Sequence, residues 1–211
     1  RWALGCEADA PLTGRPGAGG SVIATRLIRS VQISWGNADL ATSIGVTGLC
    51  VASINAMGTE EQKEKYLSRI CGTELKIGAM GLTETNSGSD SMALETTAAK
   101  VDGGYVLNGT KQFCTNGGIA DIQVAFATTN KSKGSAGVAG FVIAKGTTGM
   151  RQGRKERKLG VRASHTAQDI FEDCFIPDDK RLGYDSGGNM TVPGSVGARS
   201  MLEATRPVVG A

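Results

Sequence analysis

Hydrophobic residues recur with a helical period in the first third of the chain. From Ser21, which can cap a helix, apolar residues fall on one face at the spacing of an α-helix. A second helix is predicted over residues 38–57, and because its residues are mostly small and uncharged we expect it to be buried against other helices. Thr59 and Gln62 have the spacing of a capping box, which predicts a short third helix through Leu67.

After Gly72 the helical period gives way to alternation, which indicates strands. One strand should end near Met80, and others are expected at residues 96–101, 105–107, 121–128, 138–144 and 169–176. The Asp102-Gly103-Gly104 segment is typical of a tight hairpin turn. Because no helical pattern separates these short strands, we expect a compact antiparallel barrel or sandwich.

The order of these patterns predicts an α+β protein in three parts. Residues 1–74 are expected to form part of a helical N-terminal domain, and residues 75–180 a middle antiparallel β-barrel or sandwich domain. From about Asn189 the pattern drifts back toward helix. Residues 181–211 are therefore assigned to a linker and the start of a C-terminal helical bundle.

Composition excludes several functional classes. The 23 basic and 20 acidic residues give a net charge of +3, which is too weakly basic to predict nucleic-acid binding. No stretch approaches the roughly 20 apolar residues that span a bilayer, so we expect no transmembrane segment. Five widely spaced cysteines without a C-x-x-C pair, and a single histidine, argue against a metal site. They favour reduced, buried thiols in an intracellular protein.

Two polar loops are the candidates for chemistry. Residues 81–90 follow the strand that ends near Met80 and gather hydroxyls and backbone amides around glycine, which can bind an anion. Taken alone, this loop is more typical of a solvated turn than of an anion site. In residues 113–118 the Phe113 ring precedes the Thr115 hydroxyl by two positions, so both can point to one face. The simpler interpretation is a strand end with a core phenylalanine.

Taken together and in order, these segments resemble the acyl-CoA dehydrogenase family over essentially the whole chain, and most of all its medium-chain type. The matching segments are Leu82-Thr83-Glu84, Gly88-Ser89-Asp90, Asn108-Gly109-Thr110-Lys111, Thr115-Asn116-Gly117-Gly118, Gly153-Arg154-Lys155-Glu156, residues 159–166, Phe171-Glu172-Asp173 and residues 205–209. The resemblance implies a helical domain, a middle β-domain and a C-terminal helical bundle.

The resemblance also implies that the protein binds FAD. Leu82 and Thr83 match positions that meet the pyrimidine edge of the flavin, where hydrogen bonds stabilise charge on the reduced ring. Phe113 matches the aromatic residue packed on the ring, and Thr115 matches the hydroxyl near flavin N5. Gly88 and Ser89 match the turn that lines the boundary between FAD and the pantetheine arm. Ser89 and Arg206 are the residues expected to contact the substrate.

Two residues depart from the family pattern. Thr85 stands where the family usually has proline, which loosens the turn. Phe113 stands where it usually has tryptophan, so a stacking face is kept while the indole N–H is lost. We expect these changes to affect redox tuning and specificity more than FAD binding.

The family's catalytic base is a glutamate that removes the α-proton of the acyl thioester. In some members it immediately precedes the arginine that Arg206 matches, where this chain has Thr205, which cannot serve. No catalytic residue is therefore assigned within the chain, and the base is expected beyond Ala211. Glu84 is the other candidate by motif, but the alternative is strong: a local hydrogen bond or salt bridge that holds the FAD loop.

The resulting hypothesis is FAD-dependent dehydrogenation of a saturated acyl-CoA to trans-2-enoyl-CoA. The alternatives are an enoyl-CoA reductase, a dehydrogenase of cyclic or aromatic acyl-CoA, or a non-catalytic nucleotide-binding module. The implied partners are an acyl-CoA substrate and an electron-transfer flavoprotein, in a homotetramer or homodimer. The expected location is the cytoplasm if the source is bacterial, or the mitochondrial matrix if it is eukaryotic.

The basic residues between 151 and 158 could bind a nucleotide phosphate, but interruption by Gln152 and Glu156 favours a solvated face or a subunit contact. Arg162, Ser164 and Thr166 match a family segment that lies near the CoA and FAD phosphates. His165 lies within that segment and is interpreted as structural, because no carboxylate is evidently paired with it.

Overall fold

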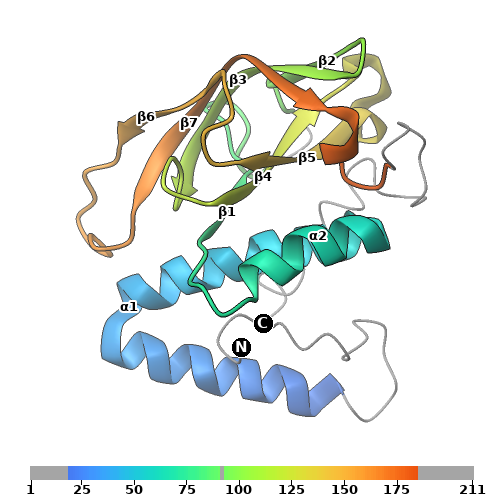
Figure 1. Ribbon diagram of the computed structural model, residues 1–211. Coiled ribbons are helices and arrows are strands. Elements are labelled where there is room, and N and C mark those ends of the chain that lie inside the picture. The colour runs from blue at the N-terminus through green and yellow to red at the C-terminus, as the bar shows by residue number, and fades with distance from the viewer. Residues whose placement is uncertain (1–18, 91–92, 185–211) are drawn as a thin grey trace.

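The computed structural model describes residues 19–90 and 93–184 and has two layers. A pair of helices, α1 (Gly19–Met57) and α2 (Glu60–Ile70), lies on one side of a curled sheet (Figure 1). The expected C-terminal helix and the positions Thr205 and Arg206 lie outside the described residues.

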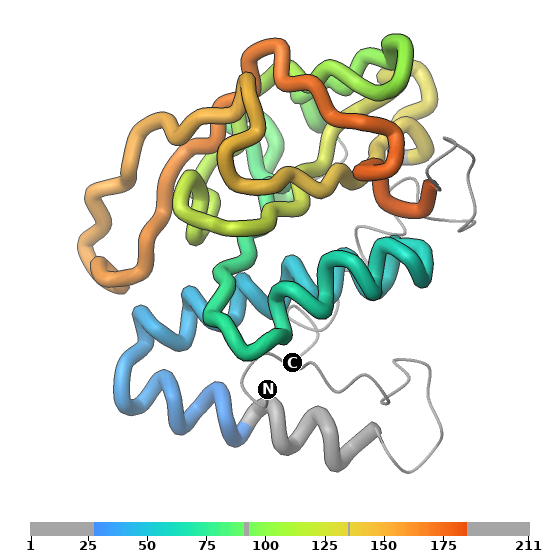
Figure 2. Tube along the Cα trace, viewed as in Figure 1, coloured from blue at the N-terminus to red at the C-terminus, as the bar shows by residue number. Residues whose placement is uncertain are grey.

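Helix α1 bends sharply at Asn37, whose backbone is extended at φ −162° and ψ 104°. The Asn37 side-chain oxygen accepts the N–H groups of Asp39 and Leu40, both at 3.0 Å, as a helix N-cap does. Figure 2 shows the chain doubling back at this point. The prediction that a separate helix begins near Ala38 is thus confirmed by the position of the cap.

Among the described residues, the second half of α1 packs mainly against strand β1 (Gly78–Gly81) and also against α2, while the C-terminal helices expected as its partners lie outside these residues. Thr47 and Cys50 lie directly against Gly78 of this strand, where a side chain on the glycine would meet Cys50 Cβ at 2.9 Å. The absence of a Cβ at Gly78 lets the helix and the strand approach closely.

The helical segment Ile28–Met57 is long and apolar enough to cross a membrane by length and composition, contrary to the sequence expectation. Buried helices of globular proteins meet the same criterion.

Helix α2 begins with the predicted capping box. The Thr59 side chain accepts the Gln62 N–H and the Gln62 side chain accepts the Thr59 N–H, both at 3.1 Å. The helix continues beyond the expected end at Leu67 to Ile70, because Tyr66 and Ile70 extend its buried face.

The remaining strands are β2 (Thr97–Val101), β3 (Gly104–Thr115), β4 (Ile122–Thr128), β5 (Val138–Ala144), β6 (Met150–Lys155) and β7 (Thr166–Pro177). Their order is β1-β4-β2-β3-β7-β6, with β5 also paired to β4. The sheet is a mixed half-barrel rather than an antiparallel one, because β1 and β2 both run parallel to β4. Short 3₁₀ segments cover Lys131–Gly137 and Asp178–Lys180.

The predicted hairpin joins β2 to β3, with Val101 paired to Gly104 and Gly103 at φ 71°. Strand β6 is absent from the sequence prediction, which interprets residues 151–158 as a solvated face or a subunit contact. It forms an edge of the sheet whose charged side chains are exposed, so it shows none of the alternation that predicts a half-buried strand.

Strand β4 separates two hydrophobic clusters. Ile122, Val124 and Phe126 face the helices and pack with Ile54, Met57 and Tyr66, among others. Ala125 and Ala127 face the interior of the half-barrel, where they pack with residues that include Leu107, Phe141 and Phe171. The sheet therefore has one face under the helices and a second, enclosed face of its own.

Three cysteines, Cys50, Cys114 and Cys174, are free and buried, as expected. Burial raises the pKa of Cys50 to about 12 and that of Cys174 to about 11, so both thiols stay protonated and unreactive near neutral pH. Cys71, at the end of α2, is disulfide-bonded, which corrects the expectation of reduced thiols throughout.

Candidate functional site

The two polar loops meet because the loop after β1 lies along β3. The N–H of Gln112 donates to the Thr83 carbonyl at 2.8 Å, and its side-chain amide donates to the Thr85 hydroxyl at 3.1 Å. Leu82 and Thr83 therefore lie next to the strand segment that carries Phe113. The structure brings these three predicted site residues together.

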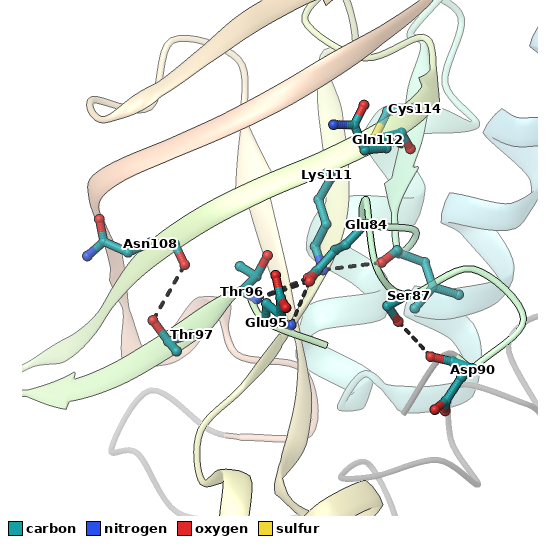
Figure 3. Close-up of polar contacts among 11 residues, drawn as sticks. Glu84, Ser87, Asp90, Glu95, Thr96, Thr97, Asn108, Lys111, Gln112 and Cys114 are labelled. Carbon is teal, nitrogen blue, oxygen red and sulfur yellow. Dashed lines mark hydrogen bonds and ion pairs between the residues drawn. The ribbon is translucent and has the colours of Figure 1, made fainter. Parts of the chain in front are cut away.

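A buried ion pair fixes this meeting point. Lys111 Nζ lies 2.6 Å from Glu84 Oε1, and the side chains are only 0% and 3% exposed. The same ammonium group, drawn next to Glu84 in Figure 3, donates to the Leu82 carbonyl at 3.2 Å. Lys111 thus ties the backbone of the Leu82–Glu84 loop to the middle of β3.

The Glu84 carboxylate is fully occupied by donors. Besides Lys111 it accepts the N–H groups of Glu95 at 2.6 Å and Thr96 at 3.1 Å. Burial acts to raise the pKa of Glu84, but the Lys111 charge and these hydrogen bonds outweigh it and leave the pKa below its ordinary value. A buried, ion-paired carboxylate of this kind is a poor general base. Of the two interpretations of Glu84, the salt bridge that holds the loop is confirmed.

Phe113 is held on the surface by a bulge in β3. The register between β3 and β7 shifts between Lys111 and Cys114, and Phe113 within the shift has φ 54°. Its side chain is 62% exposed, so the alternative of a core phenylalanine is wrong. Such a conformation is strained for an aromatic residue and is maintained by the surrounding strand pairs.

Thr115 ends β3, opposite Thr166 of β7. The hydroxyls of Thr115 and Thr83 make no hydrogen bond within residues 19–90 and 93–184. Two hydroxyl donors and one exposed ring therefore flank the same stretch of β3. These are the group types that a planar, hydrogen-bonding aromatic cofactor requires.

Gly88 and Ser89 lie on a separate exposed turn. Glu84 and Ser87 exchange two backbone hydrogen bonds at 2.9 and 3.2 Å, and the Ser87 hydroxyl donates to the Asp90 carbonyl at 2.6 Å (Figure 3). In the part of the chain that the structure describes, no hydrogen bond joins Ser89 to Phe113 or Thr115. The assignment of Gly88 and Ser89 to a cofactor or substrate contact stays a prediction.

Sequence reasoning missed a second buried polar cluster, which lies behind the Thr115–Gly118 turn. Gln123 Nε2 donates to Asp169 Oδ2 at 2.8 Å, and both side chains are essentially unexposed. A Cβ placed on Gly117 would lie 2.9 Å from both carboxylate oxygens of Asp169, so the carboxylate packs on the turn itself. Burial raises the pKa of Asp169 despite opposing contributions from Cys114, Gln123 and Gly118.

The basic residues near β6 are partly committed to contacts within the chain. Arg151 pairs with Glu172 at 2.8 Å, and Lys158 donates to the Ser164 carbonyl at 2.7 Å and the Thr166 hydroxyl at 2.8 Å. Burial first, and then the charge of Lys155, lowers the pKa of half-buried His165. These contacts indicate that the segment stabilises the loop between β6 and β7.

Two domain models of one family match the chain. The model described as "Acyl-CoA dehydrogenase, N-terminal domain" matches residues 13–74, and "Acyl-CoA dehydrogenase, middle domain" matches residues 79–174. The chain belongs to the acyl-CoA dehydrogenase family.

Individual relatives agree with this assignment. A short-chain-specific acyl-CoA dehydrogenase of Clostridium acetobutylicum is 49% identical over 142 residues, which are 67% of this chain and 37% of the relative. The structure of butyryl-CoA dehydrogenase from Megasphaera elsdenii superposes with a TM-score of 0.77 at 36% identity, covering 88% of this chain and 46% of that one.

A glutaryl-CoA dehydrogenase from Mycobacterium smegmatis, solved in complex with FADH2, superposes with a TM-score of 0.76 at 27% identity, covering 88% of this chain and 44% of that one. The chain thus spans less than half the length of these three relatives. A family relative therefore binds the flavin.

Proposed function

We propose that the protein is an FAD-dependent acyl-CoA dehydrogenase that converts a saturated acyl-CoA thioester to the trans-2-enoyl-CoA. The observation that supports this most strongly is the exposed Phe113 ring on the same stretch of β3 as Thr115 and next to the loop that carries Thr83, with neither threonine hydroxyl hydrogen-bonded among residues 19–90 and 93–184. All three are carried on segments joined by the buried Lys111–Glu84 pair. Preorganised donors beside a stacking face are what a protein supplies to a flavin.

In this proposal the chain's residues hold and tune the cofactor. Phe113 supplies a stacking face, while Leu82, Thr83 and Thr115 supply hydrogen bonds along the ring edge. When bound, FAD supplies the two-electron acceptor for the substrate's β-hydride. Lys111 and Glu84 keep the two segments in register, and the ring at Phe113 shields part of the face from water.

The base that removes the α-proton is proposed to lie outside the described residues. Glu84, the carboxylate within the matched motif, is closed off by Lys111 and two backbone N–H groups. Asp169 is buried behind the loop and not on the exposed face. An electron-transfer flavoprotein is the proposed electron acceptor, and a homotetramer or homodimer the proposed assembly.

The test uses the full-length gene product, purified and saturated with FAD. Anaerobic titration with butyryl-CoA should bleach the flavin absorbance, and titration of the reduced protein with crotonyl-CoA reports the reverse reaction. The variant Thr115→Val, which removes one donor, should bind FAD about two- to tenfold more weakly, as expected for one hydrogen bond. The matched control Thr97→Val, on β2, should not change FAD affinity. A protein that retains no flavin after reconstitution would refute the proposal.

A further inference from the structure

Asn116, immediately after Thr115, links three separate parts of the fold. Its side-chain amide donates to the Ser43 carbonyl of α1 at 3.0 Å and to the Gly78 carbonyl of β1 at 2.9 Å. Its backbone N–H donates to the His165 carbonyl, next to β7, at 2.8 Å. The residue is 1% exposed, so these bonds are shielded from water.

The backbone of Asn116 also turns the chain. Its φ of 64° lies in the left-handed region, which asparagine tolerates better than most residues. Its carbonyl accepts the N–H groups of Ile119 at 3.2 Å and Ala120 at 3.0 Å. The side chain and the backbone of Asn116 therefore both hold the turn that ends β3.

Asparagine meets two demands at this position. Two carbonyls, from Ser43 and Gly78, face its side chain and each accepts one of its N–H groups. A terminal amide supplies both from one nitrogen. Aspartate has the same shape but would place carboxylate oxygens against these carbonyls, while glycine keeps the left-handed backbone and supplies no donor.

We propose that Asn116 is the positioning residue that sets the orientation of the Thr115 hydroxyl toward the flavin, by locking the end of β3 to α1 and β1. The inference rests on the proposed function, because it assumes that Thr115 contacts the flavin. It deepens that function by giving the N-terminal helix a role in the flavin site. Ser43 reinforces the lock, since its hydroxyl also donates to the Ser164 hydroxyl at 3.3 Å.

The test is a double-mutant cycle in the full-length, FAD-loaded protein, read as the midpoint potential of the bound flavin. The variants are Asn116→Gly, Thr115→Val and their combination, with Asn108→Ala on the same strand as the matched control. Asn116→Gly should shift the potential in the same direction as Thr115→Val, and should add no further shift in a protein that already carries Thr115→Val. The control should leave the potential unchanged.

The cycle separates the inference from the proposed function. No potential shift in Thr115→Val means that Thr115 does not contact the flavin, which overturns the inference but not the proposed function. The proposed function fails separately, if the protein retains no flavin after reconstitution. A shift in Thr115→Val with a fully additive effect of Asn116→Gly supports the flavin site and overturns the positioning role. Asn116→Asp should shift the potential at least as far as Asn116→Gly, because it also repels the two carbonyls.

A second measurement uses only the parent protein, so it tests the inference even if the variants do not fold. Amide hydrogen exchange of residues 116–120 is compared in the FAD-free and FAD-loaded protein. A lock supplied by Ser43, Gly78 and His165 predicts slow exchange in both forms. Exchange that becomes slow only after FAD binds would show that the cofactor orders the turn, and would overturn the inference.

Discussion

The Gln62 side chain of α2 donates a hydrogen bond to the Arg181 carbonyl at 2.9 Å, across the boundary between helices and sheet. The same amide also reaches the Asp179 and Tyr184 carbonyls at 2.8 and 3.1 Å, and its oxygen accepts the Gly183 N–H at 3.1 Å. One buried side chain therefore both caps α2 and holds the segment that follows β7.

Gln62→Leu should lower the free energy of unfolding by about 1–3 kcal/mol, because several buried backbone groups lose their partner. Chemical denaturation measures the change, and Glu64→Ala on the exposed face of α2 is the control, expected within about 0.5 kcal/mol of the parent. Equal effects of the two substitutions would contradict this role of Gln62.

Lys111→Met should destabilise the protein by about 3–5 kcal/mol, because it leaves the Glu84 carboxylate buried without its cation. Adding Glu84→Gln should recover part of that loss, since the remaining amide is neutral. Lys63→Met, which breaks the exposed pair with Glu60, should cost only about 0–1 kcal/mol. A double variant less stable than Lys111→Met alone would argue against an uncompensated charge as the cause.

Asp169→Asn should stabilise the protein near neutral pH. Burial raises the pKa of Asp169 above its ordinary 3.8, so the folded state binds this proton more tightly than the unfolded chain does. The stability that Asp169 contributes is fully present below pH 3.8 and is lost as the pH rises through the folded-state pKa. Asparagine carries no such titration.

The stability difference between Asp169→Asn and the parent should therefore grow with pH across the window above 3.8 and then level off. Denaturant unfolding at a series of pH values measures it. Asp173→Asn, on an exposed part of the same strand, is the control. A difference that stays constant over the whole range would show that Asp169 ionises normally.

Phe113→Ala should weaken FAD binding about two- to tenfold while changing the unfolding free energy by less than about 0.5 kcal/mol. The ring is mostly exposed, so its removal costs little packing but takes away the stacking face. Phe175→Ala removes another exposed ring, from the far end of β7, and should leave FAD affinity unchanged. Fluorescence titration with FAD distinguishes the two variants.

Sequence patterns that involve only neighbouring residues predicted the structure correctly. The helix start near Ala38, the capping box of Thr59 and Gln62, and the Asp102–Gly104 hairpin each depend on a few neighbouring residues, and each is present. Strand β6 was not predicted, because its exposed side chains show no alternation of apolar and polar residues. The parallel pairing of β1 with β4 depends on contacts between distant segments, which no local pattern specifies.

The site was only partly predictable for a similar reason. Tyr105, Leu107 and Lys111 lie on one face of β3 at a period of two, and this period could have identified Lys111 as buried. The bulge at Phe113 then interrupts the alternation of buried and exposed residues along β3, so the alternation does not predict the side of the strand on which Phe113 lies. The family resemblance supplied Phe113 and Thr115, whereas Asn116 as a link between α1 and β1 became visible only in three dimensions.

The parallel pairing of β1 with β4 constrains the order in which the molecule can assemble. The β2–β3 and β4–β5 pairs join segments that are close in sequence and close small loops, so they can form early and quickly. Strand β1 pairs with a partner beyond the whole β2–β3 hairpin and carries the helices with it, so closing that large loop is the slow step. The Leu82–Glu84 loop directly follows β1. Competence to bind a cofactor should therefore appear last during refolding, after most of the sheet has already formed.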